Sequence, residues 1–298
     1  NPYPEEVDDP EFNYVEFDTL GVVPMPEPRY VEEQDVLKYD IISSGTRKAF
    51  YLLYNEFRES TDALKEVFSQ LNGQQFDDII LDLRYNPGGY VNTSQQLCSA
   101  LAPATAMGQP FLHMTYNDKI NKTETLNFES SPLTGGASLS YQNLYVLTSG
   151  NTASASEIVI NCLKPYMEGR LYQVGTATFG KNVAQQLFTN AEAPGIELWL
   201  TTTYLSNSQG YYDYFKNGLL PDFEIEENYG AELGDFGSDE DQLMQPVLYR
   251  MENGSFPVVT NPDESEDATT LSRSRTSKHV QLLVDPIAQK PHYNRIKR

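Results

Sequence analysis

The stretch that decides the fold is "NLYVLTSGNTASASEIVINCL", residues 143–163. Its first part, "NLYVLTSG", is a continuous apolar run, which predicts a strand buried on both faces. The apolar residues after it recur at helical spacing and predict one helix face: Ala155, Ile158, Val159, Cys162 and Leu163. A strand, a tight turn and a helix in this order are typical of a βαβ unit.

The same pattern flanks this unit on both sides. Strands are predicted at "RKAFYLLY", "FDDIILDLRYN", "LYQVG", "VAQQLF" and "GIELWLTTTYL", and helices at "STDALKEVFSQLNG" and "PGGYVNTSQQLCSALAP". "PFLHMTYND" and "TETLNFE" predict a hairpin around "KINK". We therefore predict an α/β fold over residues 41–228, built of repeated strand-strand-helix units with a mostly parallel sheet.

Both ends of the chain differ in character from this core. Residues 1–40 are acidic and Pro-rich, with short β-like pieces such as "FNYVEF", and predict a lead-in or the remnant of a recruitment module. Residues 229–298 predict a C-terminal extension that is acidic first and basic later. It contains a helix-like piece, "EDQLMQPVLYRM", and a strand-like piece, "HVQLLV" (279–284). The tails are read as solvated surface, or else as a basic tail that docks on an acidic face.

Composition limits the classes of function. The 298 residues carry a net charge of −21, which argues against broad nucleic-acid binding. No apolar run reaches the roughly 18 residues of a membrane span. Cys98 and Cys162 fall on apolar helix faces and are expected to be buried free thiols, since a disulfide needs a proximity that sequence does not show. His113, His279 and His292 are scattered, so we expect no metal and no cofactor.

Ser154 lies at the turn between the strand and the helix of the opening stretch. In open parallel sheets, ligands gather at the carboxyl ends of strands, and the N–H groups that start a helix are unpaired donors. That placement suits a nucleophile whose developing oxyanion meets a neighbouring N–H group. "TASASE" equally fits a helix cap, in which Ser154 and Glu157 form a capping box.

Two further turns follow predicted strands. In "VGTATFGKN", Lys181 is a candidate base, because burial can lower the pKa of a lysine toward neutrality. In "LRYNPGGY", Gly88 and Gly89 allow the backbone to pass close to a ligand with bare N–H groups. Taken singly, the lysine also fits an ordinary surface residue, and "NPGG" an ordinary turn.

Together these stretches resemble the C-terminal processing proteases, a serine peptidase family that includes the tricorn-type enzymes. The resemblance rests on four ordered motifs across roughly 45–228: "ILDLRYNPGG", "VLTSGNTASASEIV", "VGTATFGKNVAQQ" and "GLLPDFEI". The nearest likeness is to Bacteroidetes-type envelope members. It implies a ClpP/crotonase-like core and a location in the bacterial cell envelope, periplasmic or as an outer-membrane lipoprotein. Family members commonly carry a PDZ domain before the core, and no such carboxylate-binding loop is seen in residues 1–40.

The resemblance also implies roles for residues. The nucleophile falls on Ser154 and not on Ser156, and the general base falls on Lys181. Gln185 would orient the lysine. The oxyanion hole would use the N–H of Ala155 and one from the pair Gly88 and Gly89, with Gly88 favoured.

The function expected from these motifs is a serine endopeptidase with a Ser–Lys dyad. Its partner would be a polypeptide, bound extended along a strand edge, with no nucleic acid. A catalytically silent peptide-binding module on the same fold is the main alternative. A crotonase-type acyl-CoA enzyme shares the winding, but no motif signals a CoA pocket. "NPGGYVNTS" lacks the Lys-Ser/Thr ending of a nucleotide loop.

Overall fold

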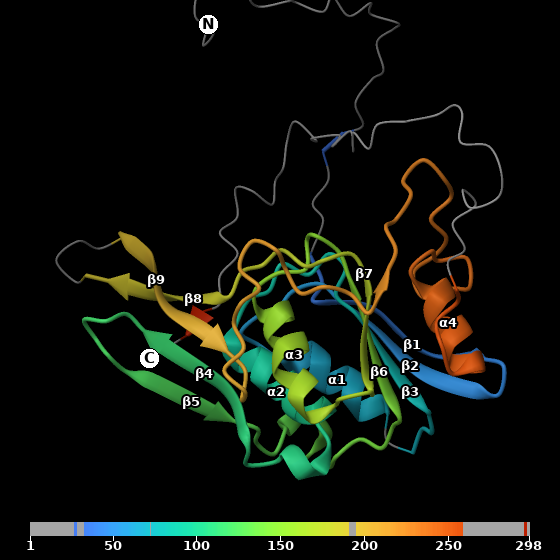
Figure 1. Ribbon diagram of the computed structural model, residues 1–298, viewed down its shortest axis with the longest axis horizontal. Coiled ribbons are helices and arrows are strands. Elements are labelled where there is room, and N and C mark those ends of the chain that lie inside the picture. Colours follow the sequence, from blue (N-terminus) through green and yellow to red (C-terminus); the bar gives the residue numbers. More distant parts are fainter. Residues whose placement is uncertain (1–26, 29–32, 72, 191–194, 259–294, 297–298) are drawn as a thin grey trace, which may run out of the picture. The chain divides into compact units, whose positions relative to one another are not determined.

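A six-stranded sheet forms the centre of the structure (Figure 1), a computed structural model that describes residues 27–28, 33–71, 73–190, 195–258 and 295–296. The sheet has the order β1-β2-β3-β6-β7-β10. Its strands are β1 (Val36–Ser44), β2 (Arg47–Tyr54), β3 (Asp78–Asp82), β6 (Asn143–Thr148), β7 (Leu171–Gly175) and β10 (Phe223–Glu224). All neighbours pair in parallel except β1 and β2, which pair antiparallel.

The central strands are buried on both faces, as their continuous apolar runs predict. Alternate residues of β2 enter two separate cores. Phe50, Leu52 and Tyr54 join the larger core under helices α1 (Asp62–Gln70), α2 (Val91–Leu101) and α3 (Ala155–Leu163). Three short 3-10 helices also belong to the fold: η1 (Ala104–Ala106), η2 (Pro132–Thr134) and η3 (Lys164–Tyr166).

Helix α4 (Met244–Asn253) lies on the opposite side of the sheet from α1, α2 and α3 (Figure 1). Its Met244, Val247 and Met251 are buried in the second core with Ala49 and Tyr51 of β2. The first part of the stretch expected as a C-terminal extension therefore supplies the cover of this sheet face. At the other end, β1 begins within the expected lead-in.

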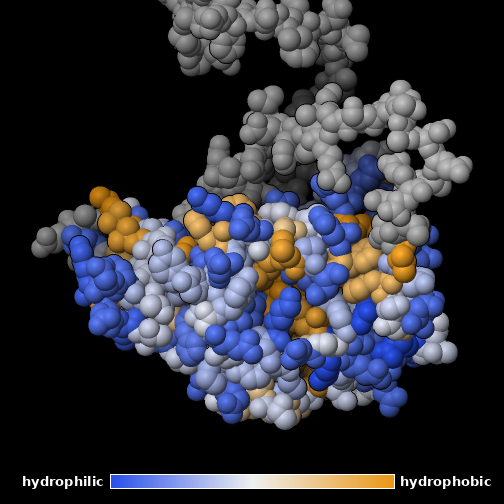
Figure 2. Space-filling view, in the orientation of Figure 1, coloured by the Kyte–Doolittle hydropathy of each residue, from blue (hydrophilic) through white to orange (hydrophobic). Residues whose placement is uncertain are grey.

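A second sheet of five strands has the order β11-β8-β9-β4-β5. It holds β4 (Pro110–Tyr116), β5 (Thr123–Asn127), β8 (Val183–Thr189), β9 (Glu197–Ser206) and the two-residue strand β11 (Arg295–Ile296). The β8–β9 hairpin reaches beyond the body and exposes Leu187, Phe188 and Leu198. Figure 2 shows apolar surface at its outer end.

The structure confirms the predicted α/β class and the mostly parallel sheet. Strands β2 and β7 have the predicted bounds, and β4 and β5 form the predicted hairpin. Cys98 and Cys162 are buried and free, as expected. The β-like piece at 12–17 and the strand-like piece at 279–284 lie outside the described residues. Within the described part of the chain, no helix has the length and apolar character that crossing a bilayer requires.

Candidate active site

The three predicted turns leave the same edge of the central sheet. Asp82 at the end of β3 pairs with Leu147 of β6, and Thr148 of β6 pairs with Gly175 of β7. The turns are then bonded to one another. The Ala153 N–H donates to the carbonyl of Asn86 at 3.1 Å, which joins the "NPGG" turn to the serine turn.

Ser154 occupies a strained backbone position immediately before α3. Its φ of 64° and ψ of −114° are rare for a residue with a side chain. The residue is fully buried, and among the described residues its Oγ makes no hydrogen bond of good geometry, although Ser154 and Glu157 adopt the capping-box arrangement. A strained serine between a buried strand and a helix is compatible both with a helix cap and with the predicted nucleophile turn.

Ser156 has a different environment. Its hydroxyl donates to the carbonyl of Asn86 at 3.0 Å, and the side chain is buried. The hydroxyl of Ser156 thus fixes the start of α3 to the "NPGG" turn, whereas that of Ser154 makes no such bond within the described part of the chain.

Glu157 links the serine turn to the lysine turn. Its Oε2 accepts from the Ser154 N–H at 2.7 Å and from the Lys181 N–H at 2.8 Å. Its Oε1 accepts from Thr178 Oγ1 and from the Gly180 N–H, each at 2.6 Å. Because both backbone nitrogens bond to the same oxygen, those of Ser154 and Lys181 lie close together, separated by at most the sum of these two distances.

The Glu157 carboxyl is fully buried. Burial raises its pKa above the ordinary value, and the four hydrogen bonds oppose that rise. Sequence reasoning treats Glu157 only as a capping-box partner. Its bond to the Ser154 N–H is that of a cap, but its bonds to residues 178–181 could not be read from local spacing.

Lys181 lies in the turn that precedes β8, partly buried. Burial lowers its pKa to about 8, while the charge of Glu157 acts in the opposite direction. A lysine with this pKa is a base at mildly alkaline pH, because a substantial fraction of the amine is then neutral.

The two glycines allow the close approach of backbones at the site. At Gly88, where φ is +102°, an added Cβ would lie 2.6 Å from Ser154 Cβ and 2.8 Å from the Ala155 nitrogen. At Gly89 an added Cβ would lie 2.0 Å from the Phe57 carbonyl oxygen. Only glycine fits either position.

The hydrogen bonding of the Gly88 N–H differs from the expectation that this group is open toward a ligand. It donates to Asn86 Oδ1 at 2.9 Å, inside its own turn, and is not open toward a ligand. Since an Asx-type bond two residues apart is local, the "NPG" spacing itself is the signal that could have predicted it. The Ala155 N–H opens α3, where the first N–H groups have no partner within the helix.

Gln185 lies on β8, four residues after Lys181. Its Oε1 is buried and has no hydrogen-bond partner within the part of the chain that the structure describes. The hydrogen bond from the lysine to this oxygen, which the resemblance implies, is therefore not made in this conformation.

Sequence reasoning missed Arg84, which is the largest fully buried side chain. Its guanidinium bonds to Asp82, to Glu227 at 2.9 Å and to Asp241 at 2.7 Å. Two of these carboxylates belong to the segment that leads into α4. Arg84 thus fastens that segment to the end of β3, four residues before Gly88.

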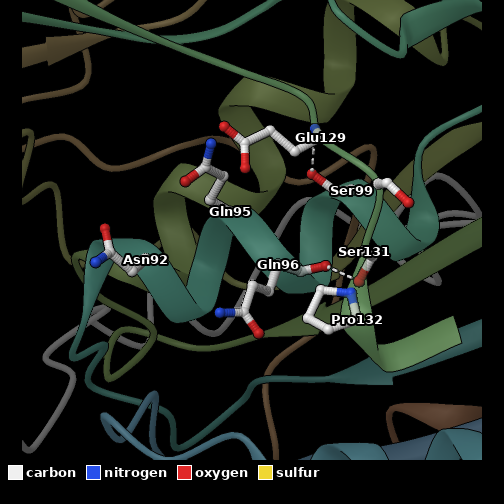
Figure 3. Close-up of a pocket in the computed structure, with 8 residues that line it drawn as sticks. Asn92, Gln95, Gln96, Ser99, Glu129, Ser131 and Pro132 are labelled. Carbon is white, nitrogen blue, oxygen red and sulfur yellow. Dashed lines mark hydrogen bonds between the residues drawn. The ribbon is translucent and has the colours of Figure 1, made fainter. Parts of the chain in front are cut away.

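One pocket of 370 Å³ lies apart from the predicted residues. Figure 3 shows it between α2, which supplies Asn92, Gln95, Gln96 and Ser99, and the loop from Glu129 to Pro132. None of the six predicted site residues lines it. Among the described residues, no group of three or more His, Cys, Asp or Glu is placed to hold a metal ion.

Residues 48–225 match the sequence profile of peptidase family S41, and all four motifs fall within that span. The chain belongs to peptidase family S41. It is 31% identical over 180 residues to a carboxyl-terminal-processing protease of Synechocystis sp., covering 59% of this chain and 38% of that protein. A protein of the same name from Picosynechococcus sp. is 30% identical over 204 residues, covering 67% and 44%.

A solved S41 structure agrees with this assignment. The putative S41 protease of Bacteroides fragilis is 32% identical and superimposes with a TM-score of 0.68, over 76% of this chain and 60% of its own. The S41 chain described here has the ClpP/crotonase-like fold. It spans less than half the length of the two curated relatives.

Proposed function

We propose that this S41 chain is a serine endopeptidase that works with Ser154 as nucleophile and Lys181 as general base. The observation that carries the proposal is the shared oxygen of Glu157, which holds the backbones of both residues. The unengaged Ser154 hydroxyl and the lowered pKa of Lys181 support it further.

The proposed reaction begins when neutral Lys181 accepts the proton of Ser154 Oγ as that oxygen attacks a peptide carbonyl. The oxyanion that forms accepts hydrogen bonds from the Ala155 N–H and from an N–H of the glycine pair. Because the Gly88 N–H is bonded to Asn86, Gly89 is the better second donor. The Lys181 ammonium then protonates the leaving amine, and water hydrolyses the acyl-enzyme to return the serine.

The proposed substrate is an extended polypeptide. Its relatives are named carboxyl-terminal-processing proteases, which supports cleavage near a chain end. Phe179, two residues before Lys181, is 61% exposed and offers an apolar contact beside the base. We also assign the protein to the bacterial cell envelope, by analogy with the family resemblance.

Proteolysis by matched serine variants tests the proposal. Fluorescein-labelled casein serves as an unfolded substrate for the wild type, Ser154→Ala, Lys181→Ala and Ser156→Ala, each checked for folding by circular dichroism. We expect Ser154→Ala and Lys181→Ala to lose at least about a thousandfold in rate. Ser156→Ala should remain active. A folded wild type without activity would favour a silent peptide-binding module instead.

A further inference from the structure

A β-bulge interrupts the pairing of β8 and β9 close to Lys181. Val183 pairs with Tyr204 and Ala184 with Thr203, but Gln185 then pairs with Thr201. The shift leaves Thr202 as the extra residue of β9, next to Gln185. Bulges of this kind redirect side chains and are frequent beside active sites.

Two buried acceptors at this bulge have no partner. Thr202 Oγ1 and Gln185 Oε1 both lack a hydrogen bond among the described residues, and both atoms are inaccessible to solvent. Buried polar atoms are nearly always hydrogen-bonded, because an unmade bond is unfavourable. Two such atoms on adjacent strands, in the hairpin that Lys181 leads into, require an explanation.

We propose that Thr202 is a positioning residue for the base, acting with Gln185 to receive the Lys181 ammonium. This inference rests on the proposed function. Neutral lysine has two N–H donors, and it gains a third when it takes the Ser154 proton. Thr202 Oγ1 and Gln185 Oε1 accept from that ammonium, which later returns a proton to the leaving amine. Both oxygens are unpartnered among the described residues and are thus available to accept from an ammonium.

The side-chain directions agree with this role. On β8, Gln185 lies on the same side of the strand as Val183, because alternate residues of a strand share a side. On β9, Thr202 shares its side with Tyr204, the partner of Val183. Thr203 points to the other side with Ala184, and its Oγ1 is also buried without a partner. Thr203 is therefore a matched control.

The test is the pH dependence of Ser154 labelling by diisopropyl fluorophosphate, measured as a second-order rate constant. This reagent reports base activation of the serine without needing a peptide-binding site. Thr202→Val removes one acceptor from the ammonium, so the pKa of Lys181 should fall. In the pH profile of the labelling rate, the rise on the acid side should then occur about one pH unit lower than in the wild type. The rate on the plateau should fall about tenfold. Thr202→Ser should restore both values.

Thr203→Val also removes an unpartnered buried hydroxyl, but on the other side of the strand. It should leave the rise on the acid side where it is in the wild type. The inference is wrong if Thr202→Val keeps the wild-type profile, or if it slows labelling with no shift of that rise, which would indicate a structural role only. Full labelling of Ser154 in Lys181→Ala would instead refute the proposed function itself.

Discussion

The backbone N–H groups of Ser154 and Lys181 donate to one and the same carboxylate oxygen, Oε2 of Glu157. The two residues are 27 positions apart in the chain. Ser154 comes directly before α3, and Lys181 comes shortly before β8. A buried carboxylate therefore sets the spacing of the proposed nucleophile and base. In the proposed mechanism, this arrangement would keep the base Lys181 beside the nucleophile Ser154.

Removal of the Glu157 charge should damage both stability and activity. In Glu157→Gln, the amide has one acceptor oxygen for four donors, so at least one buried N–H loses its partner. We expect a loss of about 2–4 kcal/mol in the free energy of unfolding in urea. Glu168→Gln, at an exposed site after the same helix, should change neither property. Wild-type activity in folded Glu157→Gln would show that the clamp is dispensable.

The lowered pKa of Lys181 predicts a rising pH profile. Below about 8, kcat/KM on labelled casein should rise about tenfold per pH unit as the amine becomes neutral, and it should level off above that value. An activity that falls over this range would contradict lysine as the base.

The lowered pKa of Lys181 also predicts that the free energy of unfolding depends on pH. Between pH 8 and 10.5 the unfolded chain binds more protons at Lys181 than the folded chain does, so folding becomes more favourable as the pH rises. Lys181→Met should be inactive but up to about 3 kcal/mol more stable than the wild type at pH 7. Urea unfolding of both proteins at pH 7 and pH 10 measures this, and the difference between them should shrink at the higher pH.

Gly88 should tolerate no side chain. An alanine Cβ would lie 2.6 Å from Ser154 Cβ and 2.7 Å from the Ala153 carbonyl oxygen, at a backbone φ of +102°. Gly88→Ala should therefore destabilise the protein by more than about 2 kcal/mol and abolish activity. Gly150→Ala, in the serine turn with open space around it, is the control and should behave as the wild type in thermal melts.

Arg84 should be essential for the attachment of α4. Arg84→Gln leaves Asp82, Glu227 and Asp241 without their shared cation, and we expect a loss of about 3–5 kcal/mol. Hydrogen exchange should become faster across Met244–Asn253. Arg58→Gln, whose side chain is 39% exposed, removes ion pairs with Asp35 and Glu56 at the surface and should cost under about 1 kcal/mol. Equal effects of the two substitutions would contradict the proposed attachment.

The sequence predicts those features that depend on local pattern. The bounds of β2 and β7 follow from continuous apolar runs, and the serine turn follows from a strand directly before a helix. The Arg84 cluster could not be predicted, because its partners Glu227 and Asp241 are 143 and 157 residues away. The expected open N–H of Gly88 was wrong because a side-chain oxygen two residues earlier competes for it.

The proposed dyad of Ser154 and Lys181 is tested most directly by the site of covalent labelling with diisopropyl fluorophosphate, mapped by peptide mass spectrometry at pH 8. We expect one adduct in the wild type, on Ser154, and none in folded Lys181→Ala under the same conditions. Lys164→Ala, which alters an exposed lysine at the end of α3, should label like the wild type. An adduct on another residue, or equal labelling of Ser154 without Lys181, would contradict a dyad of these two residues.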